Sequence, residues 1–401
     1  MNHLKAQIKA LAHAFHEEVT GFRRHLHRHP ELSFQEVETA RFVAQKLTET
    51  GITPTTGVAG NGVVALIEGE KSGPAKTVAL RADLDALPIV EANEVSYKSE
   101  NEGVMHACGH DVHTASLLGT AKILYELRPH FSGTVKLIFQ PAEERLPGGA
   151  SLMIKAGVLE NPRPESIFGQ HVHPPLEAGK VGFRPGMYMA SADEIYVRIQ
   201  GRGGHGALPQ NCVDPIAITA QIITALQQIV SRQANPTTPT VLTFGKINSI
   251  GGATNIIPNE VRLEGTFRTL NENWRDRALE SMKKMAEGIA KSMGGNCIFD
   301  IVRGYPFLVN DEALTRRARD RAVAFLGAEN VVDLPIRMTA EDFAWYSQKL
   351  PACFYRLGTG NPARGITSPV HTNTFDVDEA CLETSIGLMS WLTITELENA
   401  P

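Results

Sequence analysis

One cysteine and three histidines lie within the segment MHACGHDVHT, which spans positions 105–114. Cysteine and histidine side chains either bind borderline metal ions or act together as a nucleophile and its base. Three kinds of site are therefore open: a structural metal site, a cysteine nucleophile, or part of a catalytic metal centre. Each kind needs different residues from the rest of the chain.

Carboxylates and further histidines occur at four other places: Asp83 and Asp85 after TVALRA, Glu143 and Glu144 after KLIFQPA, His171 at the end of SIFGQH, and His371 in SPVHTNTF. A closed structural zinc site is disfavoured, because Cys108 has no cysteine partner nearby. A cysteine–histidine nucleophile pair would leave the carboxylates without a role. A catalytic metal centre would use all of these residue types.

The number of candidate ligands favours two metal ions over one. A single catalytic zinc takes three protein ligands and a water. Five or more candidates fit a pair of ions roughly 3.5–4 Å apart that activate a shared water. In the tandem of Glu143 and Glu144, one carboxylate can bind metal while its neighbour takes the proton of the water. Cysteine and histidine favour zinc, nickel or cobalt, and glutamate also accepts manganese.

The elements that must position these residues follow from hydrophobic periodicity. Short apolar runs at 62–69, 77–83, 133–140 and 166–171 alternate with segments of helical spacing such as 111–127. This alternation predicts an α/β domain with a mostly parallel sheet and helices on both faces. Functional groups collect at the carboxyl ends of strands in such sheets, so we expect the candidate ligands to meet there.

The pattern changes near residue 187. Strands are predicted at 193–201, 240–247, 260–268 and 297–302, with helices at 214–230 and 271–293. The order strand–helix–strand–strand–helix–strand is that of a ferredoxin-like α+β unit. We therefore predict a catalytic domain in two parts, residues 1–186 and 304–401, with an inserted domain at 187–303.

Composition excludes several classes of partner. A net charge of −5 without any run of lysine or arginine disfavours nucleic acid. No apolar stretch approaches the roughly 20 residues that span a bilayer, and the N-terminus lacks a secretory apolar core. Five widely spaced cysteines fit a reducing compartment. We therefore expect a cytoplasmic protein without a membrane partner.

Seven motifs occur in order along the chain: RRHLHRHPELSFQE, LRADLDALP, MHACGHD, FQPAEE, GGHGALP, NIIPNEVRLEGTFRT and MTAEDF. Over essentially its whole length the sequence resembles the hippurate hydrolase and indole-acetyl-amino-acid hydrolase family of N-acyl-L-amino acid amidohydrolases, in the clan of aminoacylases and dinuclear metallo-carboxypeptidases. The resemblance implies cleavage of the amide bond of an N-acyl amino acid. It also implies two divalent metal ions per subunit (zinc, manganese, nickel or cobalt).

The resemblance further implies roles for individual residues. Glu143 would be the general base and then the general acid. The inserted domain would be a lid through which subunits form a dimer or tetramer, with His205 reaching a neighbouring active site to polarise the scissile carbonyl. Asn255 and Arg268 would hold the substrate carboxylate. The implied metal ligands are Cys108, His110, Glu144, His171 and His371.

Asp85 is expected either to cap a turn or to orient a ligand from behind, as metal sites usually require. The histidines of RRHLHRH are expected to form an exposed or packing surface. His106 and His113 are favoured as capping or ligand-orienting groups rather than ligands. PAEERLPGGA departs from the glycine run of many relatives at Arg145 and Leu146, which bears on acyl selectivity. The roles of Asp83, Glu341 and Asp342 are left open: Asp83 could cap the turn after its strand. Glu341 and Asp342 could cap a helix that opens at Phe343 or add a carboxylate behind the metals.

Two alternatives stay open at this point. The same centre could serve a carboxypeptidase or dipeptidase, or a deacetylase of an amino-acid biosynthetic intermediate of the N-acetyl-diaminopimelate type. A non-enzymatic metal store or substrate-binding module could use the same ligands. Glu143 distinguishes the enzyme from the store, because a store needs no unligated carboxylate beside its metals. The acyl group, the amino acid, the native metal and the oligomeric state are left open.

Overall fold

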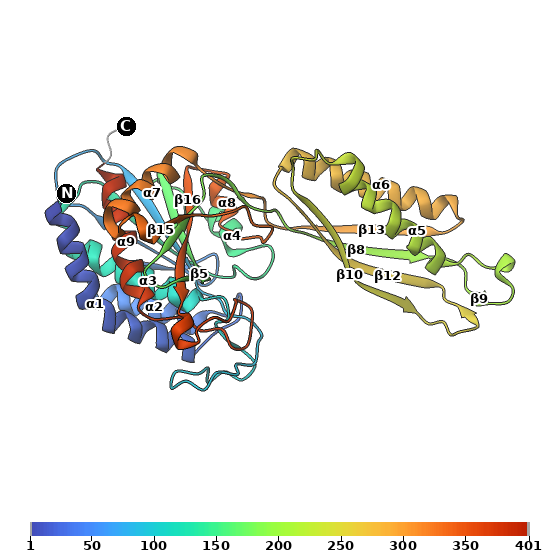
Figure 1. The fold of residues 1–401 in the computed structure, drawn as a ribbon, viewed down its shortest axis with the longest axis horizontal. Helices are drawn as coiled ribbons and strands as arrows, with labels where there is room; N and C mark the ends of the chain where they lie inside the picture. The colour runs from blue at the N-terminus through green and yellow to red at the C-terminus, as the bar shows by residue number, and fades with distance from the viewer. Residues whose placement is uncertain (1, 399–401) are drawn as a thin grey trace. The chain divides into compact units, whose positions relative to one another are not determined.

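The structure is a computed structural model that describes residues 2–398, and the chain forms two compact units. The first unit runs as far as Gly186 and includes Val309–Pro335 and the chain from Asp342 onward. The second unit comprises Met187–Leu308 and Ile336–Glu341. Figure 1 shows both units. Two short strands, β7 (Gly186–Met189) and β14 (Leu308–Asn310), lie in sequence where one unit gives way to the other.

The first unit is built on an eight-stranded sheet, in which the strands are ordered β1-β2-β4-β3-β5-β16-β6-β15. Its strands are β1 (Pro54–Val58), β2 (Gly62–Glu68), β3 (Thr77–Asp83), β4 (Thr134–Gln140), β5 (Ser166–Glu177), β6 (Val181–Phe183), β15 (Val331–Asp333) and β16 (Ala352–Gly360). The central strands β4, β3, β5 and β16 are mutually parallel. Strands β1 and β2 pair antiparallel with their neighbours, and β6 pairs antiparallel with β16 but parallel with β15. The mostly parallel sheet confirms the predicted α/β class.

Strand β3 has the burial that is typical of the centre of a parallel sheet. All seven residues of TVALRAD are buried, as in a strand covered on both faces. Val78, Leu80 and Ala82 belong to the main hydrophobic core with residues of helices. Arg81 points to the other side, where its guanidinium binds Asp342 at 2.7 Å. The strand therefore separates an apolar layer from a polar one.

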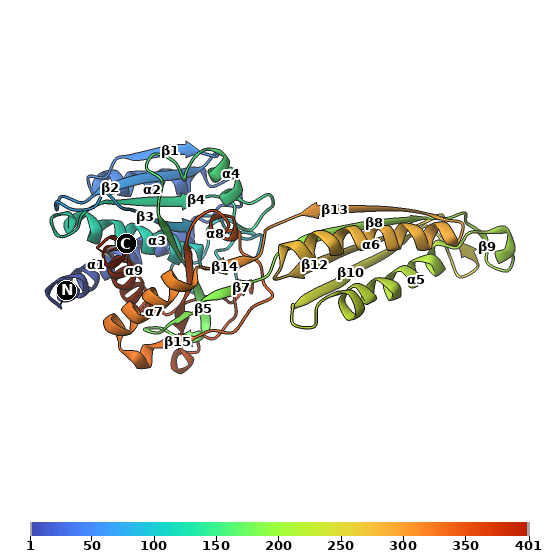
Figure 2. The ribbon, with the colours of Figure 1, turned by 90° about the horizontal axis from the view of Figure 1, so that it is seen from above.

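The helices of the first unit are α1 (Asn2–Arg28), α2 (Val37–Glu49), α3 (His110–Glu126), α4 (Gly149–Lys155), α7 (Glu312–Leu326), α8 (Ala344–Ser347) and α9 (Cys381–Leu397). Helices α1, α3 and α9 pack on one another, as the views in Figures 1 and 2 show. Helix α4 contacts β4 and α8, and α8 contacts β16. Helix α3 is buried along almost its whole length, so its first turn is held rigidly.

The second unit has its own sheet and core. Its strands are β8 (Asp193–Gln200), β10 (Thr240–Ile250), β12 (Glu260–Thr269) and β13 (Asn296–Arg303), in the antiparallel order β10-β12-β8-β13. Helices α5 (Pro215–Gln228) and α6 (Glu272–Ser292) pack on this sheet, and β9 (Gly204–His205) pairs with β11 (Ile256–Ile257). Alternate residues of β8 are buried against both helices in a separate hydrophobic core.

The helix termini of this unit follow from the sequence. Asp214 accepts hydrogen bonds from the backbone N–H groups of Ile216 and Ala217 at the start of α5, and Asn271 accepts one from Trp274 at the start of α6. Among residues 2–398, no helix combines the length and the apolar character needed to cross a membrane.

Candidate metal centre

The parallel strands bring the predicted ligands to one edge of the sheet. Glu144 follows β4, His171 lies within β5, and His110 opens helix α3. Gly109, just before this helix, has φ +81°, and a Cβ atom there would lie 2.6 Å from a methyl carbon of Val172. Only glycine fits this turn, because it combines left-handed backbone with close packing against the ligand-bearing strand.

Cys108 lies at the centre of the ligand cluster. Its Sγ atom is 3.4 Å from Nε2 of His171 and 3.2 Å from Nε2 of His371. His371 Nε2 is in turn 3.2 Å from Oε1 of Glu144. Two groups of three donor atoms, each group within 4.8 Å, therefore share the thiol: Cys108 with His110 and His171, and Cys108 with Glu144 and His371.

The hydrogen bonds of the histidines fit a metal site. Nδ1 of His171 donates to the carbonyl oxygen of Val172 at 2.8 Å, which leaves Nε2 with its lone pair toward Cys108. Nδ1 of His110 lies 3.2 Å from Asp85, whereas its buried Nε2 has no hydrogen-bond partner among the described residues. A buried nitrogen without a partner is costly, and a metal ion would satisfy it. The five residues could thus hold two ions.

The electrostatics disfavour a free thiolate nucleophile. Burial, and then the charges of Glu144 and Glu143, raise the pKa of the Cys108 thiol well above its ordinary value. A nucleophilic cysteine instead needs neighbours that lower its pKa. Burial lowers the pKa of His110, but the carboxylates of Asp83 and Asp85 outweigh it and raise this pKa to about 10. The negative charge gathered here suits divalent cations.

Asp85 holds both glutamates through their backbone. Its carboxylate accepts hydrogen bonds from the N–H groups of Glu143 and Glu144 at 3.0 and 2.9 Å, and from the hydroxyl of Ser33 at 2.6 Å. With the contact to His110, one buried carboxylate touches a candidate ligand and the backbone of two further site residues. The Glu143 side chain is buried, and its Oε1 accepts from the N–H of Asp342 at 3.3 Å.

A second carboxylate acts on His171 indirectly. Asp83 lies 2.6 Å from Nδ1 of His113, and Nε2 of His113 accepts a hydrogen bond from the N–H of Val172 at 2.9 Å. Asp83 also accepts from Arg81 at 2.6 Å. This chain of contacts fixes the backbone directly beside His171. His113 is expected to be a capping or ligand-orienting group, whereas spacing does not identify Asp83 and Arg81 as the residues behind it.

The segment that carries His371 is anchored by backbone contacts. His371 has φ +63°, unusual for a residue other than glycine, and its N–H donates to the carbonyl oxygen of Ala107 at 2.7 Å. Farther along this segment, Asp376 accepts a hydrogen bond from Arg23 at 2.8 Å. Arg23 also donates to Asp111, in the first turn of α3, at 2.8 Å. These contacts join the segments on either side of Cys108.

The histidines of RRHLHRH differ from one another. His27 is fully buried and lies 2.8 Å from Asp111 and 3.2 Å from Glu91, so it is a packing residue. His25 instead stacks on Phe42. His106 is also buried, and neither of its ring nitrogens has a hydrogen-bond partner among the residues that the structure describes.

The remaining predicted residues lie in the second unit. His205 is exposed in β9, and its Nδ1 accepts from the N–H of Ala207 at 3.1 Å. Asn255 is exposed nearby, and its carbonyl oxygen accepts from the N–H of Gly206 at 2.8 Å. Arg268, in β12, is half-buried and donates to the carbonyl oxygen of Met338 at 3.3 Å. His205 and Asn255 are thus neighbours within this unit.

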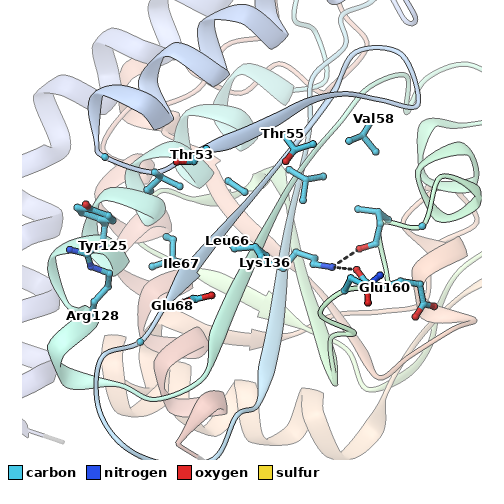
Figure 3. A pocket seen from close by; sticks show the side chains of 18 of the residues that line it. Thr53, Thr55, Val58, Leu66, Ile67, Glu68, Tyr125, Arg128, Lys136 and Glu160 are labelled. Atoms are coloured by element: carbon cyan, nitrogen blue, oxygen red, sulfur yellow. Dashed lines mark hydrogen bonds between the residues drawn. The ribbon is translucent and has the colours of Figure 1, made fainter.

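A cavity of about 800 Å³ in the first unit lies apart from this chemistry. Figure 3 shows its lining residues, which come from β1, β2 and the segments around Arg128 and Glu160, and none of the candidate ligands is among them. Its most buried polar group, the ammonium of Lys136, donates to the carbonyl oxygens of Val158 and Glu160 at 2.9 and 2.7 Å. This lysine therefore holds the loop that contains Val158 and Glu160.

Comparison with known proteins agrees with the geometry. The family model for peptidase family M20/M25/M40 matches residues 79–392. The chain is 39% identical to an N-acetylcysteine deacetylase of Bacillus subtilis, over 96% of this chain and 98% of that protein. It is 44% identical to an N-acyl-L-amino acid amidohydrolase of Geobacillus stearothermophilus, over 76% and 81%.

A solved structure is similar over almost the whole chain. It is that of the YXEP protein of Bacillus subtilis, described as a dinuclear metal-binding peptidase from the M20 family. It shares 37% sequence identity, covers 96% of this chain and 99% of its own, and superposes with a TM-score of 0.82. The expected resemblance is confirmed. The chain belongs to peptidase family M20/M25/M40, and it is a hydrolase that acts on amide bonds.

Proposed function

We propose that the protein hydrolyses the amide bond of N-acyl amino acids, with two divalent metal ions held by Cys108, His110, Glu144, His171 and His371. The observation that carries this proposal is the shared position of Cys108, whose thiol belongs to two groups of candidate ligands at once. The relatives named above as acting on N-acetylcysteine and on N-acyl-L-amino acids support the substrate class.

Two bound ions of zinc, manganese, nickel or cobalt would supply Lewis acidity, which lowers the pKa of a water and polarises a carbonyl group. Glu143 would move the protons of the reaction, a role that its buried carboxylate beside His110 and Glu144 supports. It takes one proton from the attacking water as the new C–O bond forms. It returns that proton to the amine nitrogen as the C–N bond breaks.

His205, Asn255 and Arg268 complete the proposed site from the second unit. A histidine can donate a hydrogen bond to the substrate's carbonyl oxygen as charge develops on it. An amide and a guanidinium suit the substrate carboxylate. Desolvation lowers the pKa of Arg268, and a carboxylate partner would stabilise its charged guanidinium group.

We further propose that the second unit, which contains the predicted insertion of residues 187–303, is a lid that joins two or more copies of the chain, so that His205 serves a neighbouring site. Strand β10 lies at the edge of its sheet, where unpaired backbone groups are available to another strand. Ile247 and Ile250 on this strand are 57% and 46% exposed, so their side chains are available to such a partner. The five free cysteines fit a cytoplasmic location.

A hydrolysis screen tests the function. Acetyl-, benzoyl- and indoleacetyl-amino acids are assayed beside dipeptides and N-acetyl-diaminopimelate, before chelation, after chelation, and with each metal added back. We expect cleavage of N-acyl amino acids that chelation abolishes and metal restores. A preference for dipeptides would favour the carboxypeptidase or dipeptidase alternative. Activity that resists every chelator would contradict the metal centre.

A further inference from the structure

The loop that carries Glu143 begins with an unusual backbone conformation. Ala142 has φ +51°, in the left-handed region that residues other than glycine rarely adopt. Its carbonyl oxygen accepts from the N–H of Gly149 at 2.8 Å, and a Cβ atom on Gly149 would lie 1.7 Å from the carbonyl oxygen of Pro141. Such a conformation persists only where its surroundings hold it.

Glu36 supplies the side-chain contact to this residue. Its Oε1 atom accepts hydrogen bonds from the N–H of Ala142 at 2.8 Å and from the N–H of Phe34 at 2.9 Å. Phe34 is itself in the left-handed region, with φ +69°. The other carboxylate oxygen accepts from the side-chain amide of Asn61 at 3.0 Å. One carboxylate group therefore binds two strained residues that lie 108 positions apart.

Glu36 has no task in capping the helix that follows it. The residue immediately precedes α2, but it makes no side-chain capping bond there. Glu31 binds that helix terminus instead, and accepts from the N–H groups of Glu38 and Thr39 at 3.2 and 2.8 Å. The Glu36 side chain is fully buried, a costly place for a carboxylate. Burial raises its pKa despite its hydrogen bonds.

The contact continues a pattern along the loop. Asp85 accepts from the next two N–H groups, those of Glu143 and Glu144. Three successive backbone amides are thus bound by carboxylates from two separate parts of the chain. Glu36 holds the first of them, where the left-handed turn sets the direction in which the Glu143 side chain leaves the backbone.

We propose that Glu36 is a positioning residue for the reaction, and that its carboxylate fixes Ala142 so that Glu143 is held in line with the substrate. This inference rests on the proposed role of Glu143 as the general base. A displacement of a catalytic group by about 1 Å can cost as much as 10²-fold in rate. Glu36 acts through length and hydrogen-bond acceptance, so its charge is not required.

Two variants separate the effect of the length of the Glu36 side chain from the effect of its charge. Glu36→Gln keeps the length and an acceptor oxygen, whereas Glu36→Asp keeps the charge and is one methylene shorter. Glu31→Asp is the matched control, because Glu31 lies in the same motif and binds backbone N–H groups that are far along the chain from Ala142. Steady-state kinetics, metal content and hydrogen exchange of the peptide that covers Ala142 are measured for all three variants and the wild type.

We expect Glu36→Asp to lower kcat about 10- to 100-fold with KM and metal content near the wild-type values, and to speed exchange in that peptide. Glu36→Gln should stay within about threefold in kcat, and Glu31→Asp should change neither rate nor exchange there. Wild-type kcat in Glu36→Asp, or equal losses in Glu36→Asp and Glu31→Asp, would overturn the proposal. A wild-type protein without hydrolase activity would refute the proposed function, while hydrogen exchange would still test the contact.

Discussion

The Sγ atom of Cys108 lies 3.2 Å from Nε2 of His371, although the two residues are 263 positions apart. The left-handed backbone of His371 and its hydrogen bond to Ala107 make this approach possible. The thiol consequently belongs to both groups of candidate ligands and not to a separate nucleophilic site. The hypothesis of a metal ligand and that of a nucleophile predict different metal contents for a Cys108→Ser variant.

We expect Cys108→Ser to lower the number of metal ions bound per subunit, because serine is a weaker ligand than a thiolate for zinc, nickel or cobalt. Elemental analysis after dialysis against a limiting chelator measures this number. Cys353→Ser is a control, since Cys353 is a buried cysteine of the strand core. Full metal content in Cys108→Ser, together with an acyl-enzyme trapped in the wild type, would instead support a cysteine nucleophile.

Asp83 should strengthen metal binding without touching the metal. An Asp83→Asn substitution would place an amide donor among Arg81 and His113, which are both donors, and so disturb the support of His171. We expect metal affinity to fall about 10- to 100-fold, the usual effect of losing such a supporting group. Competition with a coloured chelator measures the affinity. Asp333→Asn, at an exposed ion pair with Arg319, should leave it unchanged.

Glu396 makes the fold sensitive to acid. Its buried carboxylate pairs with Arg317 at 2.9 Å and with Arg321, and burial opposes but does not outweigh these partners, so that its pKa is lowered. A carboxyl group whose pKa is lower in the folded chain stabilises the fold above its unfolded pKa of about 4.3, and this contribution is lost as the pH falls below that value.

Urea denaturation of Glu396→Gln and wild type therefore gives a difference that depends on pH. We expect the variant to lose about 1–3 kcal/mol of unfolding free energy at pH 7, because the arginine donors lose a charged acceptor. The difference should shrink as the pH falls below about 4, where the wild-type carboxyl becomes protonated. A difference that is constant across this range would show that the charge of Glu396 is not involved.

If His205 serves a neighbouring subunit, inactive variants should complement one another. Glu143→Gln and His205→Ala are each expected to be nearly inactive alone. After unfolding and refolding together in equal amounts, dimers should regain about a quarter of the wild-type activity, since one site in about four combines both intact residues. No recovery, in a mixture shown to contain mixed oligomers, would contradict a shared site.

Much of the fold was predictable because the local signals agree with the tertiary structure. The buried run TVALRAD forms the fully buried β3, and the alternation in DEIYVRIQ forms the half-exposed β8. Glu144 follows β4, His171 lies within β5, and Cys108 and His110 lie at the start of α3, so that the parallel topology brings these ligands together. His371 comes instead from the segment between β16 and α9. The antiparallel pairing of β2 with β4 is a long-range choice that periodicity does not encode.

The supporting contacts of the site could not be predicted in the same way. Left-handed backbone at Ala142 and His371 has no signature in the sequence, because neither residue is glycine or asparagine. Glu36 reads as an ordinary residue before a helix, yet its carboxylate binds a loop that lies over 100 residues away. The burial of His27 against Asp111 likewise depends on how α1 packs against α3.

The most direct test of the whole account is the substitution Glu143→Gln, with metal content and kcat measured on the same preparation. Glutamine keeps the size of the side chain but cannot accept the proton of the attacking water. We expect wild-type metal content and a loss of about 10²–10⁴-fold in kcat, the usual contribution of a general base. Glu160→Gln, at an exposed glutamate beside the separate cavity, should match the wild type. A Glu143→Gln protein that binds both metals and turns over within a few-fold of the wild type would contradict the account.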